Sequence, residues 1–154
     1  MNKEAKYQHI YTSFSALLKS SVSWHVHMNN LCALMQKEFN FFWVGFYMRN
    51  DEYSLQIGPY QGDVPCFDIK IGKGVCGTAA AELSTQIVPD VHAFPGYIAC
   101  HPEPNSEIVV PGIKNNRCVF VLDIDHIENN YFDDVDKEWL EKLCALLIHN
   151  IEIY

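Results

Sequence analysis

The stretch "NFFWVGFYMRNDEYSLQIG", residues 40–58, decides the fold of this chain. Its first ten residues are mostly aromatic and aliphatic, which predicts a buried strand. The polar "NDE" at residues 50–52 is a turn signal, and "YSLQIG" at residues 53–58 predicts a second strand. Because so short a link joins neighbouring strands as a hairpin, we expect the sheet to be antiparallel.

Four more segments predict strands and bring the sheet to about six. They are "FDIKI" (67–71), "TQIV" (85–88), "SEIVVP" (106–111) and "RCVFVLDID" (117–125). Residues 89–105, which separate the second of these segments from the third, contain four of the seven prolines. We expect this proline-rich stretch to form one long functional loop.

Helices are expected at both ends of the chain. Apolar residues recur at helical spacing from about residue 4 to 38, with a break at "SSVS". A short alanine-rich helix is expected at residues 74–83, and a longer one from Asp133 onward, where Asp133 can cap the helix and Asp136 follows three residues later. Hairpin-linked strands flanked by N- and C-terminal helices predict the α+β class, in a single domain of residues 1–154.

Composition excludes several functional classes. The chain has 154 residues, of which 49% are hydrophobic, and its formal net charge is -8. Nucleic-acid binding needs clustered Lys and Arg, so no nucleic-acid partner is expected. The longest apolar run, residues 41–48, is far shorter than the roughly 20 residues that span a bilayer, and the N-terminus lacks an apolar signal segment. We therefore expect a cytoplasmic protein without a membrane partner, in a compartment that keeps thiols mostly reduced.

Six cysteines in a reducing compartment indicate metal binding, catalysis or simple burial. Cys32 and Cys144 lie in apolar helical stretches, so we expect them in the core. Cys118 begins a predicted strand and is expected to be half-buried. His25 and His27 stand two apart on a predicted helix and would point to different sides, so we expect both at the surface.

The other three cysteines, Cys66, Cys76 and Cys100, lie at loop or strand margins, where a thiol can be reached. Reachable thiols with a second thiol nearby are typical of redox chemistry. Zinc is the competing interpretation, with His101 as a fourth ligand beside the three cysteines. No C-x₂₋₄-C pair is present, although structural zinc sites usually contain one, so we predict no bound metal.

The motif "IGKGVCG", residues 71–77, has the G-x-G-x-x-G spacing of a dinucleotide-binding turn. The βαβ context that such a turn requires is missing, because a hairpin precedes the motif. We expect its glycines instead to permit unusual backbone angles and close approach at a helix start. Cys76 would then lie near a helix N-terminus, where the helix dipole lowers the pKa of a thiol.

Two carboxylates stand on one face of the strand at residues 117–125. Asp123 and Asp125 alternate with apolar residues, and Glu107 begins the preceding strand and could join them. The group could be a solvated strand end. It could also bind the ammonium group of a ligand, or keep one crowded carboxyl protonated as an acid. Metal binding by the same oxygens has no motif behind it.

Four motifs stand in one order: "GPYQGDVPCFDIKIGKGVCGTAA", "TQIVPDVHAFPGYIAC", "SEIVVP" and "VLDID". Together they resemble the free methionine-R-sulfoxide reductases, which are single GAF domains, and the resemblance runs from about Trp43 to the closing helix. It implies thiol-dependent reduction of free L-methionine (R)-S-oxide to L-methionine through a cysteine sulfenic acid and an intramolecular disulfide. It also implies no cofactor, recycling by thioredoxin or a similar dithiol, and a GAF-like antiparallel sheet; a homodimer is compatible with it.

The resemblance implies a role for each matched residue. Cys100 matches the nucleophile, Cys66 the cysteine that resolves it as a disulfide, and Cys76 a third redox cysteine. The substrate-binding positions are an acidic cluster and an aromatic wall near the substrate methyl group: Glu107, Asp123, Asp125, Trp43 and Tyr47. The chain differs from the family pattern at Tyr97, His101 and His126. The alternative function is a non-catalytic GAF domain that senses a small ligand.

Overall fold

The structure, a computed structural model, describes residues 1–150 and 152. The last residues of the helix expected from Asp133 onward, 151, 153 and 154, lie outside this part of the chain. Across the described residues, no helix has both the length and the apolar character needed to cross a membrane.

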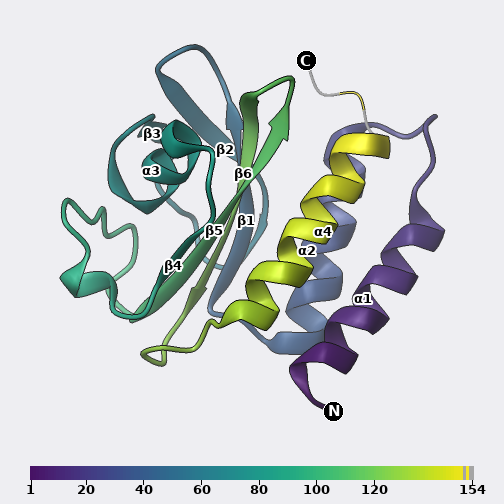
Figure 1. Ribbon diagram of the computed structural model, residues 1–154, viewed down its shortest axis with the longest axis horizontal. Coiled ribbons are helices and arrows are strands. Elements are labelled where there is room, and N and C mark those ends of the chain that lie inside the picture. Colours follow the sequence, from purple (N-terminus) through teal and green to yellow (C-terminus); the bar gives the residue numbers. More distant parts are fainter. Residues whose placement is uncertain (151, 153–154) are drawn as a thin grey trace.

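A six-stranded antiparallel sheet forms the centre of the fold (Figure 1). Its strands are β1 (Trp43–Arg49), β2 (Ser54–Gln61), β3 (Asp68–Lys70), β4 (Gln86–Val88), β5 (Ser106–Lys114) and β6 (Arg117–His126). They are arranged in the order β3-β2-β1-β6-β5-β4, and every neighbouring pair is antiparallel. The predicted hairpin and the predicted fold class are therefore confirmed.

Helices cover both faces of the sheet. On one side α2 (Trp24–Phe39) and α4 (Asp134–Asn150) pack on the sheet, and α1 (Lys3–Leu17) packs on these two helices; Figure 1 shows them in blue, yellow and purple. The two helices at the N-terminus confirm the predicted break at "SSVS". The opposite face carries α3 (Gly74–Glu82) and the long loop, which includes a short 3₁₀ helix, η1 (Val91–Ala93).

Alternation along the central strands separates two cores. On β1, Val44 and Phe46 face the three-helix side, where they join a large apolar cluster with residues of α1, α2 and α4. Trp43 and Tyr47 face the opposite side and pack with residues of α3 in a second cluster. The second face of the sheet is where the predicted site residues of β1 lie.

Two predictions of exposure were wrong. His27 is 1% exposed, because the segment between α1 and α2 lies against it, and its Nε2 lies 2.9 Å from the carbonyl oxygen of Lys19. Cys118 is fully buried rather than half-buried, and its thiol donates to the carbonyl oxygen of Phe120 at 3.1 Å. Cys32 and Cys144 are buried as predicted.

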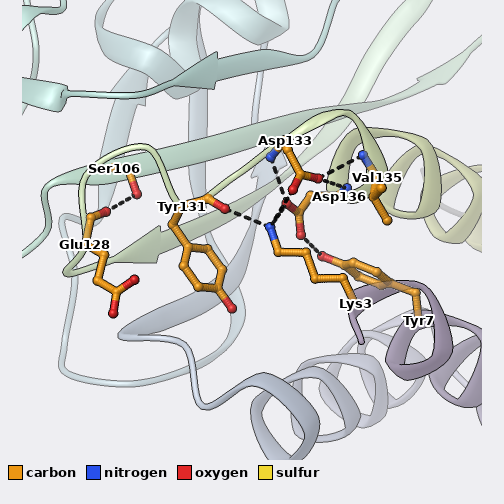
Figure 2. Close-up of polar contacts among 8 residues, drawn as sticks. All are labelled: Lys3, Tyr7, Ser106, Glu128, Tyr131, Asp133, Val135 and Asp136. Atoms are coloured by element: carbon orange, nitrogen blue, oxygen red, sulfur yellow. Dashed lines mark hydrogen bonds and ion pairs between the residues drawn. The ribbon is translucent and has the colours of Figure 1, made fainter. Parts of the chain in front are cut away.

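The start of α4 is tied to α1 by an ionic network around one buried carboxylate, Asp136 (Figure 2). The backbone N–H of Val135 donates to Asp133 Oδ1 at 2.9 Å, and the N–H of Asp133 donates to Asp136 Oδ2 at 2.8 Å, which confirms the predicted cap. Asp136 is fully buried and accepts further hydrogen bonds from Lys3 Nζ and from the hydroxyl of Tyr7. Two side chains of the N-terminal helix therefore donate hydrogen bonds to a buried carboxylate of the C-terminal helix.

Replacing Lys3 with methionine is expected to lower the free energy of unfolding by about 3 kcal/mol, because Asp136 would be left buried without its ionic partner. Methionine keeps most of the apolar part of the lysine side chain, so the decrease in the free energy of unfolding comes mainly from removing the ammonium charge. Lys37→Met, at an exposed lysine of α2, should change stability by less than about 0.5 kcal/mol. Urea denaturation at neutral pH measures both, and equal stability of the two variants would contradict the prediction.

Candidate active site

A disulfide joins Cys66, just before β3, to Cys100 in the long loop. The two Cα atoms are 5.4 Å apart although 34 positions separate the residues in the sequence. Both cysteines are partly exposed. The structure thus brings together the two thiols that the resemblance paired, at a position that a thiol in solution can approach.

The aromatic residues of β1 support the segment that carries Cys66. Trp43 and Tyr47 are each 1% exposed, and their ring centroids are 6.0 Å apart. The Tyr47 hydroxyl donates to the carbonyl oxygen of Cys66 at 3.0 Å, and Trp43 Nε1 donates to the carbonyl oxygen of Asp63 at 3.0 Å. Both rings therefore form one wall of the site and also hold in place the segment between β2 and β3, which carries Cys66.

Gly45 leaves space for the side chains of Trp43 and Tyr60, a role that was not predicted from the sequence. A Cβ at Gly45 would lie 2.5 Å from Cη2 of Trp43 and 2.5 Å from Cβ of Tyr60. Gly45 also pairs with Asp123 across β1 and β6. The available signal was a lone glycine inside an aromatic strand, which marks the close approach of another group.

The acidic residues meet on the same face of the sheet. Glu107 pairs with Asp125 across β5 and β6, and Asp123 pairs with Val109 two positions further along the same strands. Glu107 is 5% exposed and Asp123 6%, whereas Asp125 is half-buried. A solvated strand end, one of the alternatives left open by the sequence, does not describe these carboxyl groups.

Burial raises the pKa of all three carboxyl groups, and repulsion by neighbouring carboxylates raises it further for Glu107 and Asp125. For Glu107 and Asp125 the pKa lies well above its usual range, because each is desolvated and lies beside the charge of Asp123. Burial also raises the pKa of Asp123, but hydrogen bonds from Glu107 and Cys76 and the nearby His101 oppose the increase. The pKa of Asp123 is therefore raised less than that of Glu107 or Asp125.

Cys76 is the third residue of α3 and is 4% exposed, so the expectation that its thiol can be reached like those of Cys66 and Cys100 is wrong. The expected lowering of its pKa is wrong: burial raises the pKa of this thiol, and the charges of Asp123, Glu107 and Asp125 raise it further. The helix dipole is a weaker influence than desolvation beside carboxylates. Cys76 is a protonated thiol within hydrogen-bonding reach of Asp123, and it is not part of a disulfide.

The glycines just before and within the first turn of α3 place Cys76 at the site. Gly72 and Gly74 have φ angles of 90° and 65°, in the region that favours glycine. A Cβ at Gly77 would lie 2.3 Å from the carbonyl oxygen of Lys70, so the helix can begin this close to β3 only with glycine there. The predicted structural role of the motif is confirmed.

One pocket collects most of these groups. It contains about 30 Å³ of free space, and its lining includes Cys76, Cys100, both aromatic residues and all three acidic residues. Tyr97 and His101 also line it. His101 Nε2 lies 3.2 Å from the carbonyl oxygen of Val64 and so connects the two cysteine-bearing segments. The four-ligand zinc set considered from the sequence is divided, because two of its cysteines are joined to each other.

The chain matches no protein-family model. The free methionine-R-sulfoxide reductase of Saccharomyces cerevisiae is 43% identical to it over 96% of this chain and 86% of the yeast protein. The structure of the free methionine-R-sulfoxide reductase of Neisseria meningitidis in complex with its substrate is 35% identical, covers 97% of this chain and 90% of its own, and superposes with a TM-score of 0.94. A solved GAF domain is 42% identical over 99% of this chain and 91% of its own, with a TM-score of 0.93. The chain therefore has the GAF fold and belongs to the free methionine-R-sulfoxide reductase family.

Proposed function

We propose that this protein reduces free L-methionine (R)-S-oxide to L-methionine by thiol chemistry. The observation that carries the proposal is the Cys66–Cys100 disulfide at a pocket lined by buried acidic residues. A disulfide there is the expected oxidised end state of such a reaction. Membership of the reductase family supports the same substrate and the same reaction.

The acidic cluster accounts for selection of the free amino acid. Asp123 Oδ1 is buried and has no hydrogen-bond partner within the part of the chain that the structure describes. It can accept a hydrogen bond from the substrate ammonium group, and Asp125 lies on the same face, where its carboxyl oxygen can accept a second one. A methionine inside a peptide lacks that ammonium group and would leave the carboxylate unpaired. The substrate methyl group would pack against Trp43 and Tyr47.

Glu107 supplies the proton that the reaction needs. Sulfoxide sulfur becomes electrophilic when its oxygen is protonated, and a carboxyl group that stays neutral can donate that proton. The Cys100 thiolate then attacks the sulfur and takes the oxygen as a sulfenic acid, which releases methionine. The Cys66 thiol condenses with the sulfenic acid, so that the disulfide forms and water leaves.

A dithiol protein must reduce this disulfide before the next turnover. We propose thioredoxin or a similar dithiol in a cytoplasmic, thiol-reducing setting, because both cysteine residues are partly exposed and so permit thiol–disulfide exchange. Cys76 would act as a third redox thiol, which could form a disulfide after the Cys66–Cys100 pair has reacted. The homodimer that the sequence analysis allowed stays a prediction, which sedimentation velocity would test.

The decisive experiment couples NADPH oxidation to thioredoxin and thioredoxin reductase. We expect turnover with free methionine R-sulfoxide, and at least about 100-fold lower kcat/KM with the S epimer and with peptide-bound sulfoxide. Equal turnover of all three substrates would contradict the assignment. The alternative, a GAF domain that only senses a ligand, predicts binding without any change in the number of free thiols.

A further inference from the structure

Three buried side chains with metal-ligating atoms converge in the pocket that Cys100 also lines. The Sγ of Cys76 and one carboxylate oxygen from each of Glu107 and Asp123 all lie within 4.8 Å of one another. The three residues come from α3, β5 and β6, so the cluster is fixed by the packing of the helix on the sheet. Each side chain is at least nine-tenths buried.

The cluster has an acceptor that the protein itself does not use. Asp123 is 6% exposed, and its Oδ1 has no hydrogen-bond partner in residues 1–150 and 152. Within the same described residues, no lysine or arginine forms an ion pair with any of the three side chains. A buried oxygen without a partner, beside a thiol and a second carboxyl, is a site for a positively charged ligand.

The available space favours a small ligand in the disulfide form. About 30 Å³ of free space suffices for an ion or a water molecule, whereas an amino acid would require the lining to move. A tetrahedral zinc site has ligand bonds of about 2.0–2.3 Å, so ligand atoms within 4.8 Å of one another need only small side-chain rotations to converge.

We propose that Zn²⁺, or another thiophilic divalent cation such as Cd²⁺, binds to Cys76, Glu107 and Asp123 and excludes the sulfoxide substrate. This regulation rests on the proposed function, because it places the ion where the substrate ammonium group would bind. The Cys76 thiol and the Glu107 carboxyl release their protons to solvent as they bind the ion, and a water molecule completes the tetrahedron. Mg²⁺ and Ca²⁺ prefer six or more oxygen ligands and should not compete.

Direct binding is measured by titrating the disulfide form with Cd²⁺ and following the ultraviolet thiolate-to-cadmium charge-transfer band. In this form Cys66 and Cys100 cannot bind the ion, and Cys32, Cys118 and Cys144 are buried away from the pocket. We expect one equivalent of Cd²⁺ to bind. Cys76→Ser should abolish the band, and Glu107→Gln should weaken binding at least about 100-fold. Cys118→Ser is the matched control and should keep the band.

Absence of the band in the unmodified protein, or its persistence in Cys76→Ser, would overturn the site. Circular dichroism verifies that each variant is folded, and Glu107→Gln tests the site independently of the cysteine. In the coupled assay Zn²⁺ should inhibit competitively with methionine sulfoxide, and noncompetitive inhibition would overturn the exclusion of substrate. The titration needs no turnover, so a protein that binds Cd²⁺ but reduces no sulfoxide would refute the proposed function and leave the metal site intact.

Discussion

Replacing Cys100 with serine is expected to lower turnover of free methionine R-sulfoxide by at least about 10³-fold. A serine hydroxyl has the same position and nearly the same size, but at neutral pH it is not ionised and cannot attack sulfur. The same variant cannot form the disulfide with Cys66, so it should keep its full count of free thiols after exposure to the sulfoxide. The coupled NADPH assay and a thiol titration measure the two effects separately.

Two other cysteines control this experiment. Cys118→Ser removes a buried thiol whose hydrogen bond to the carbonyl oxygen of Phe120 a hydroxyl can replace, so activity should remain near that of the unmodified protein. Cys66→Ser should still release one equivalent of methionine and leave a sulfenic acid on Cys100, which dimedone would trap. Full turnover by Cys100→Ser would show that a different thiol attacks first.

Local pattern was sufficient to predict the fold, because alternation and turn length are properties of short segments. The polar "NDE" at residues 50–52 indicates the β1–β2 hairpin, whose link is residues 50–53, and alternation along β6 places Asp123 and Asp125 opposite the three-helix side. Strand ends were predicted less well. β2 runs to Gln61 because Val44 and Gln61 pair across the sheet, and this contact cannot be read from either segment alone.

The pKa of Cys76 could not be predicted from local sequence in the same way. The helix start before Cys76 is visible in the sequence and argues for a reactive thiol. The pKa of Cys76 is raised instead, because β5 and β6 bring Glu107 and Asp123 against it from positions 31 and 47 residues away along the chain. Burial of His27 has the same kind of cause, since it depends on how α2 meets the segment that follows α1.

Replacing Glu107 with glutamine is expected to lower kcat by about 10²–10⁴-fold and to change KM little. Glutamine has the shape of a protonated glutamic acid and can still donate a hydrogen bond to Asp123, but it has no proton to give to the sulfoxide oxygen. Asp123→Asn should act in the opposite way and mainly raise KM, because the substrate ammonium group would lose its ionised partner. Steady-state kinetics with the free R-sulfoxide separates the two effects.

The pH profile distinguishes a proton donor from a residue that only shapes the pocket. The pKa of Glu107 is raised, so its carboxyl keeps the proton to a higher pH than a glutamic acid in water. Activity of the unmodified protein should therefore be present below this raised pKa and fall as the pH passes through it, and Glu107→Gln should lack that decline. Glu103→Gln, at an exposed residue of the long loop that precedes β5, should keep the unmodified profile. If Glu107→Gln instead kept both the kcat and the alkaline decline, the proton would have to come from Asp125, whose pKa is raised by the same burial and the same neighbouring charge.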